Sequence, residues 1–128
     1  MLSENLQIYR DLYELSRRLL QNQRNVPKTV RYGEYGRAVS MSLDALDMVY
    51  VANSDAARRP AALTRILQLT GGVRSRVRLM GELGYVGNRE AVNLMYLLDK
   101  INRQAVGWRN ASHGQSRGGT ADTGEPHL

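Results

Sequence analysis

Arginine side chains are the residues of this chain whose type and spacing could do chemistry. They make up sixteen of its eighteen cationic residues, and the net charge is +6. Arg74 and Arg78 are four residues apart, so a helix places them on one stripe, while Arg76 points elsewhere. A guanidinium group is a planar fork that fits phosphate and carboxylate groups. The pattern therefore predicts binding to a phosphate backbone or to an acidic protein surface, with a solvated basic surface as the alternative.

Eight cationic residues are the candidate partner-binding and nucleic-acid-binding residues. They lie on the first and third of the expected helices and around the entry to the second: Arg17, Arg18, Lys28, Arg31, Arg37, Arg74, Arg76 and Arg78. Each could instead be a surface residue that covers neighbouring apolar area. Five tyrosines could stack on nucleic-acid bases, or they could lie as amphipathic residues at the boundary of the core: Tyr9, Tyr32, Tyr35, Tyr85 and Tyr96.

The sequence contains no pattern that predicts catalysis or metal binding. Both histidines, His113 and His127, lie near the C-terminus, and there is no cysteine. No helical histidine-based metal motif is present, and the glycines match no phosphate-binding loop. We therefore expect no catalytic residue, no metal and no cofactor, and a protein that is not an enzyme.

Apolar residues recur every three or four residues in four stretches, which predicts four amphipathic helices. We expect these helices over residues 3–24, 30–57, 59–83 and 89–109. Pro27 ends the first helix, Pro60 opens the third, and Gly84 follows its end. Four such helices with short connections predict an all-α fold, an antiparallel up-down-up-down four-helix bundle.

The same periodicity predicts the residues of the core. On the first helix, the expected seam is Leu6, Tyr9, Tyr13, Ser16 and Leu20, with Leu12 and Leu19 flanking it. On the fourth helix, the spacing is most regular and predicts a seam of Ala91, Leu94, Leu98, Ile101, Ala105 and Trp108. Gly71 and Gly72 lie inside the third helix, where each glycine costs roughly 1 kcal/mol, so they indicate a close backbone approach.

The bundle domain is expected to span residues 1–109. Residues 110–128 are rich in Gly, Ser and Thr, and this composition predicts a disordered polar tail. The N-terminus is polar from residue 3, and no apolar run approaches the roughly 18 residues needed to cross a membrane. We therefore expect a cytoplasmic protein with no membrane partner.

Three stretches together resemble the accessory variability determinant (Avd) proteins of diversity-generating retroelements. They are VPKTVRY (26–32) followed by Gly36–Arg37, VRSRVRLMGELG (73–84) and VGW (106–108). The resemblance covers about residues 6–109. The chain differs from the family in having Tyr35 before Gly36, where members often have leucine, and in its long polar tail.

The resemblance implies a homopentameric barrel of four-helix protomers. It also implies a partner reverse transcriptase, binding to template RNA and other nucleic acid, and a non-catalytic role in mutagenic cDNA synthesis. Arg74 and Arg78 match the family arginines associated with engaging the reverse transcriptase. The wider group includes proteins encoded in ribosomal-RNA intervening sequences. A homo-oligomeric bundle of that kind, without a reverse transcriptase, is therefore the alternative, and a small enzyme with a site inside the bundle is a third hypothesis.

Overall fold

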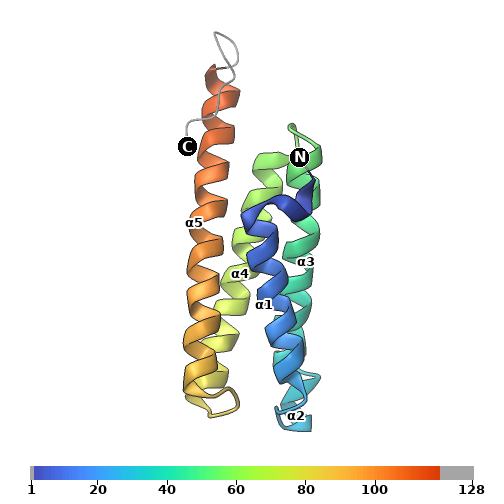
Figure 1. Ribbon diagram of the computed structural model, residues 1–128, viewed down its shortest axis with the longest axis vertical. Helices are drawn as coiled ribbons and strands as arrows, with labels where there is room; N and C mark the ends of the chain where they lie inside the picture. Colours follow the sequence, from blue (N-terminus) through green and yellow to red (C-terminus); the bar gives the residue numbers. More distant parts are fainter. Residues whose placement is uncertain (1, 119–128) are drawn as a thin grey trace.

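The computed structural model describes residues 2–118, and every regular element among them is a helix (Figure 1). The elements are η1 (Ser3–Asn5), α1 (Gln7–Gln23), α2 (Lys28–Arg31), α3 (Glu34–Ser54), α4 (Arg59–Glu82) and α5 (Asn88–Gly118). The four long helices pack together through the pairs α1–α3, α3–α4, α4–α5 and α1–α5. The predicted all-α fold with four packed helices is thereby confirmed for the described residues. None of these helices is both long enough and apolar enough to cross a membrane.

The core is one cluster of mainly aliphatic side chains from all four long helices. On α5, the predicted seam is confirmed at its centre, where the side chains are buried: Leu94, Leu98, Ile101 and Ala105. The ends of that predicted seam, Ala91 and Trp108, are only half-buried. The regular spacing on α5 therefore identified the residues that face the other helices.

The predicted seam of the first helix is wrong in register. Helix α1 leaves Tyr13 and Leu20 exposed and buries an aliphatic stripe instead: Ile8, Leu12, Leu15 and Leu19. Both stripes have helical spacing, so periodicity does not separate them. The aliphatic stripe is buried because it removes only hydrocarbon from water, whereas each buried tyrosine must also find a partner for its hydroxyl group. Ser16 is buried as predicted, and its hydroxyl lies 2.7 Å from that of Ser42.

The first two expected helices have other boundaries in the structure. Leu6 has an extended conformation, which divides the expected helix 3–24 into η1 and α1. Pro27 is extended as well, and the single turn α2 follows it. Helix α3 then begins at Glu34 instead of residue 30, because Gly33 leaves the helical conformation. The result is a separate short element, α2, at one end of the bundle.

Helix α5 extends further than predicted. It continues to Gly118, so the expected end at residue 109 is wrong, and residues 110–118 are helical instead of disordered. Ala111 and Ser112 are buried there. Adding residues to an existing helix costs little because the nucleus has already formed, which explains the continuation through a polar sequence. The rest of the predicted tail, 119–128, lies outside the described residues.

The end of α4 is a Schellman motif that sets the turn into α5. Gly84 has φ 79°, a conformation that glycine adopts without steric cost. The Tyr85 N–H donates to the Met80 carbonyl at 2.8 Å, and the Gly84 N–H donates to the Gly81 carbonyl at 3.1 Å. The predicted role of Gly84 at this helix end is therefore confirmed.

The two adjacent glycines inside α4 have different surroundings. A Cβ atom at Gly72 would lie 2.7 Å from the Met41 sulfur, so this glycine makes room for a side chain of α3, and no backbone atom of α3 lies within 4 Å among its three nearest neighbours. A Cβ atom at Gly71 would meet no heavy atom within 4 Å. Of the two glycines, only Gly72 therefore leaves space for a side chain of α3.

Tyr35 links the start of α3 to the end of α1. Its ring is buried, and its hydroxyl donates to the Leu19 carbonyl at 2.8 Å. Burial raises the pKa of the Tyr35 phenol, so the native state holds the neutral, hydrogen-bonding form. This contact fixes the base of α3 beside the last turn of α1.

Candidate nucleic-acid interface

Positive charge collects at the end of the bundle that carries α2. Figure 1 shows α2 and the α4–α5 connection at this same, lower end. We call it the α2 end and define it as residues 14–37 and 76–90. These two stretches hold nine cationic and four acidic residues, a net charge of +5. The remaining residues up to 113 hold eight cationic and six acidic residues, a net charge of only +2. The fold thus concentrates charge that lies apart in the sequence.

All four carboxylates of the α2 end form ion pairs with arginines of the same end. The pairs are Glu14 with Arg17 (2.7 Å) and Arg18 (3.4 Å), Glu90 with Arg18 (3.1 Å), Glu34 with Arg76 (2.9 Å) and Arg37 (3.5 Å), and Glu82 with Arg78 (3.2 Å). Four of the nine cations of the α2 end have no ion pair with any described residue: Arg24, Lys28, Arg31 and Arg89. Since five arginines share the four carboxylates, these four cations supply +4 of the net charge of +5 at this end.

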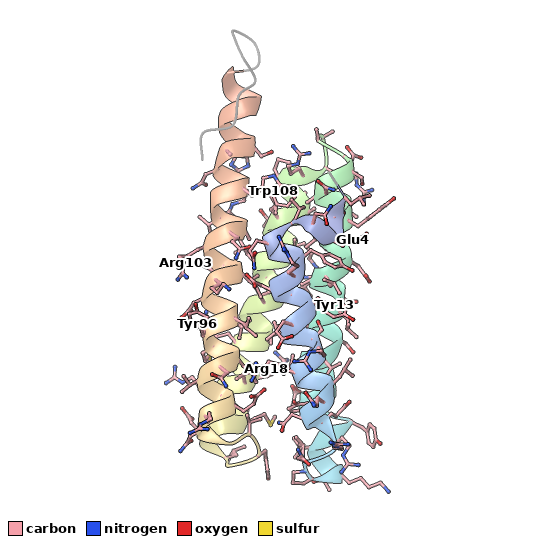
Figure 2. All side chains as sticks on the ribbon, in the orientation of Figure 1. Glu4, Tyr13, Arg18, Tyr96, Arg103 and Trp108 are labelled. Atoms are coloured by element: carbon pink, nitrogen blue, oxygen red, sulfur yellow. The ribbon has the colours of Figure 1, made fainter. Side chains whose placement is uncertain are left out.

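Arg18 connects α1 to the beginning of α5 (Figure 2). Its guanidinium donates two hydrogen bonds to Glu90, at 3.1 and 3.2 Å. The hydrogen bond with Glu90 raises the pKa of Arg18, and the hydrogen bond from Arg17 lowers the pKa of Glu14. Arg17 and Arg18, both predicted binding residues, therefore have carboxylate partners that compete with any phosphate.

A polar pocket of about 340 Å³ lies between the end of α1 and the start of α5. Its lining combines cationic and amide side chains with one carboxylate: Arg17, Arg18, Gln21, Asn22, Arg24, Asn25 and Glu90. Guanidinium and amide N–H groups are the donors that bind phosphate oxygens. The pocket could therefore bind a phosphate through Arg24, which has no carboxylate partner, and through the neutral amide donors beside it.

The predicted residue Arg31 holds α2 against the end of α1. Its side chain donates to the Val26 carbonyl and to the Arg24 carbonyl, both at 3.1 Å. The guanidinium carbon also lies 5.9 Å from the ring centroid of Tyr32. Arg31 thus positions its neighbours, while the predicted residue Lys28 is exposed at the beginning of α2.

Arg74 and Arg78 lie at an apolar groove between α4 and α5, and Arg78 also belongs to the α2 end. Arg74 pairs with Asp99 across the two helices, whereas Arg78 pairs with Glu82 on its own helix and is 77% exposed. The groove has a volume of about 590 Å³, and its apolar lining includes Val77, Ala91, Val92, Met95 and Tyr96. The two arginines, predicted to share a stripe, thus lie at one groove: Arg78 lines it, and Arg74 pairs with Asp99, which also lines it.

Arg76 points away from that groove, as its sequence position predicts. Its side chain is only 20% exposed, pairs with Glu34 on α3 and donates to the Gly72 carbonyl at 3.1 Å. Arg37 shares the same carboxylate at the start of α3. The eight predicted residues therefore do not form one site. Six belong to α1–α3 or to the α3–α4 contact, and two belong to the α4–α5 groove.

Arg24 and Arg89 are absent from the predicted set, although both are exposed and have no ion pair. Arg24 lies just before Pro27, and Arg89 lies just after the turn that Gly84 begins. The sequence offers one signal for them, namely that both cations lie beside helix ends. In an up-down bundle, the first and third connections lie at the same end, so cations beside these two connections come to the same end. Arg89 also adjoins Glu90, which contacts Arg18 from 72 residues away.

Comparison with family models, curated proteins and solved structures found no match to the chain. The charges and contacts of the α2 end and of the α4–α5 groove are therefore the grounds for a functional inference.

Proposed function

We propose that this protein is a non-catalytic accessory protein of a diversity-generating retroelement. In this proposal, a basic homo-oligomer binds the reverse transcriptase and the template RNA in the cytoplasm and supports mutagenic cDNA synthesis. The protomer is an antiparallel up-down-up-down bundle, and the assembly is a homopentameric barrel. The observation that carries the proposal is the group of four cations without carboxylate partners at the α2 end: Arg24, Lys28, Arg31 and Arg89.

RNA binding at the α2 end is electrostatic. When an unpaired cation of the protein contacts a phosphate, it releases counterions from the RNA, and this release favours binding. No ion pair within the protein has to break. The pocket beside Arg24 adds neutral donors for phosphate oxygens. A ring of protomers repeats this weak site several times, so that one RNA engages several copies and binds with greater avidity.

The reverse transcriptase is proposed to dock on the α4–α5 groove, next to Arg74 and Arg78. Two exposed apolar residues of α5, Val92 and Tyr96, line this groove. Apolar grooves with a charged rim are typical of protein–protein contact surfaces. The groove reaches Asn88, next to the unpaired Arg89, so the enzyme and the RNA would bind adjoining surfaces of one protomer.

The affinity for RNA should fall steeply as salt increases. Each phosphate contact of a single strand contributes about −0.7 to the slope of log K against log [salt], so four cations predict a slope of about −3 per protomer. Fluorescence anisotropy with a labelled template-repeat RNA, between about 50 and 200 mM salt, measures this slope. An affinity that does not change with salt would contradict the proposal.

Replacing both Arg74 and Arg78 with alanine should abolish co-purification with the reverse transcriptase. Both ion pairs are exposed, and such pairs contribute at most about 1 kcal/mol, so helical content and oligomer mass should not change. The matched control replaces Arg58 and Arg65, two exposed arginines at the other end of α4, with alanine. Undiminished co-purification of the Arg74/Arg78 variant would show that the enzyme docks elsewhere.

The genomic neighbourhood separates this function from its alternative. A reverse-transcriptase gene and a template repeat beside the coding sequence would support the retroelement assignment. A surrounding ribosomal-RNA gene would identify an intervening-sequence protein and contradict it.

A further inference from the structure

Tyr32 is an aromatic ring exposed among the unpaired cations of the α2 end. At 73%, it is more exposed than any other large apolar or aromatic side chain in the described part of the chain. It follows α2 directly, and its N–H donates to the Val30 carbonyl. A ring exposed to this extent gains nothing from the core, so packing does not account for its position.

The ring has one positioned neighbour, the Arg31 side chain. The Arg31 guanidinium lies over it at 5.9 Å, and two backbone carbonyls fix that guanidinium in turn. One face of the ring is thus covered by a positioned cation, and its high exposure leaves the opposite face to solvent. An anchored aromatic face loses little conformational entropy when a planar group stacks on it.

Cations flank this face along the chain. Lys28 is exposed at the other end of α2, and Arg24 is exposed in the polar pocket of α1. The Arg24 carbonyl accepts a hydrogen bond from Arg31, so the backbone at Arg24 lies beside the side chain that covers Tyr32. An aromatic platform with cations beside it is the arrangement that binds single-stranded nucleic acid, because the platform takes a base while the cations take the neighbouring phosphates.

We propose that the α2 end selects single-stranded RNA, with one unpaired base stacked on the open face of Tyr32 and adjacent phosphates bound by Arg24 and Lys28. This inference rests on the proposed function, since it requires RNA at this end. A duplex is excluded from the stacking contact because its bases are already stacked on one another. It retains only the phosphate contacts and therefore binds more weakly.

Other exposed tyrosines lack this combination. Tyr13 stacks on Tyr9 with ring centroids 6.3 Å apart, and Tyr96 lies in the α4–α5 groove under Lys100. Tyr50 is 66% exposed and lies in the second half of α3, outside the α2 end. Tyr50 is therefore the matched control for Tyr32.

The test compares a labelled, unstructured RNA of about 12 nucleotides with its duplex of the same length, at about 100 mM salt. The unchanged protein should bind the single strand about tenfold more tightly than the duplex, as expected for one stacked base. Tyr32→Ala should remove this tenfold preference and leave both duplex binding and the salt slope unchanged. Tyr32→Phe and Tyr50→Ala should behave as the unchanged protein, and circular dichroism should show equal helical content for all variants.

The outcomes separate the two proposals. Salt-dependent RNA binding in which Tyr32→Ala retains full affinity for the single strand would overturn the stacking site and leave the proposed function in place. An equal loss for single strand and duplex would also overturn it, because it would show a general role for Tyr32 in shaping α2. If the unchanged protein binds neither RNA, the proposed function fails as well.

Discussion

Replacing Arg24, Lys28 and Arg89 together with glutamine is expected to lower the affinity for single-stranded RNA about 100-fold at about 100 mM salt. These three exposed cations have no ion pair within the described residues, so each is available to a phosphate. The slope of log K against log [salt] should fall from about −3 to about −1, because one unpaired cation remains. Glutamine has a helix propensity close to that of arginine and lysine, so the fold should persist.

Arg31 is left unchanged in this variant because it has a structural role. Its hydrogen bonds to the Val26 and Arg24 carbonyls hold α2, so its replacement would alter the shape of the α2 end together with its charge. Anisotropy titrations with the template-repeat RNA measure the affinity, and circular dichroism verifies the helical content.

The control for this variant removes the same charge elsewhere. Arg58, Arg65 and Arg103 are exposed and lie outside the α2 end, and Arg103 projects outward from α5 (Figure 2). Changing all three to glutamine should reduce the affinity several-fold at most, since only the long-range field weakens. Equal losses for the two triple variants would show that RNA responds to net charge and not to the α2 end.

Leu63→Ala is expected to lower the free energy of unfolding by about 3 kcal/mol. Leu63 is fully buried on α4, in the core shared by the long helices. Truncation removes favourable apolar transfer and leaves a cavity that a close-packed core fills only in part. Small domains are stable by roughly 5–15 kcal/mol, so this loss should move the urea midpoint markedly.

Leu79→Ala makes the identical chemical change on the same helix, at a side chain that is 46% exposed. Its cost should stay below about 1 kcal/mol, because little buried area is lost and no cavity forms. Urea unfolding followed by circular dichroism measures both variants. Similar losses at the two positions would contradict the packing of α4 described above.

The core could be predicted from sequence where one stripe is clearly more apolar than the rest. On α5, only one stripe qualifies, and its central residues Leu94, Leu98 and Ile101 are buried. On α1, two stripes have helical spacing, and the choice between them depends on the helices that pack against it. Tyr13 was predicted inside and is exposed, because single-helix periodicity contains no information about neighbouring hydroxyl partners.

The candidate site could be predicted only as a set of residue types. Arginine spacing indicated phosphate or carboxylate partners, yet an arginine with an acidic neighbour in space cannot be told from one without it. Arg18 finds Glu90 on α5, and Arg76 finds Glu34 on α3. Both partners lie more than 40 residues away along the chain. Arg24 and Arg89 have no carboxylate within ion-pairing distance, and neither is among the eight predicted binding residues.

The sequence by itself determined the helical class, the number of long helices, the glycine turn at Gly84 and the abundance of arginine, because these depend on local spacing and composition. Only the tertiary structure decided which cations keep an uncompensated charge. Ion pairing acts over a few ångströms, and the bundle brings the two stretches 14–37 and 76–90 together at one end. There every carboxylate has an arginine partner, and four cations have none: Arg24, Lys28, Arg31 and Arg89. Arg31 lies beside the exposed ring of Tyr32.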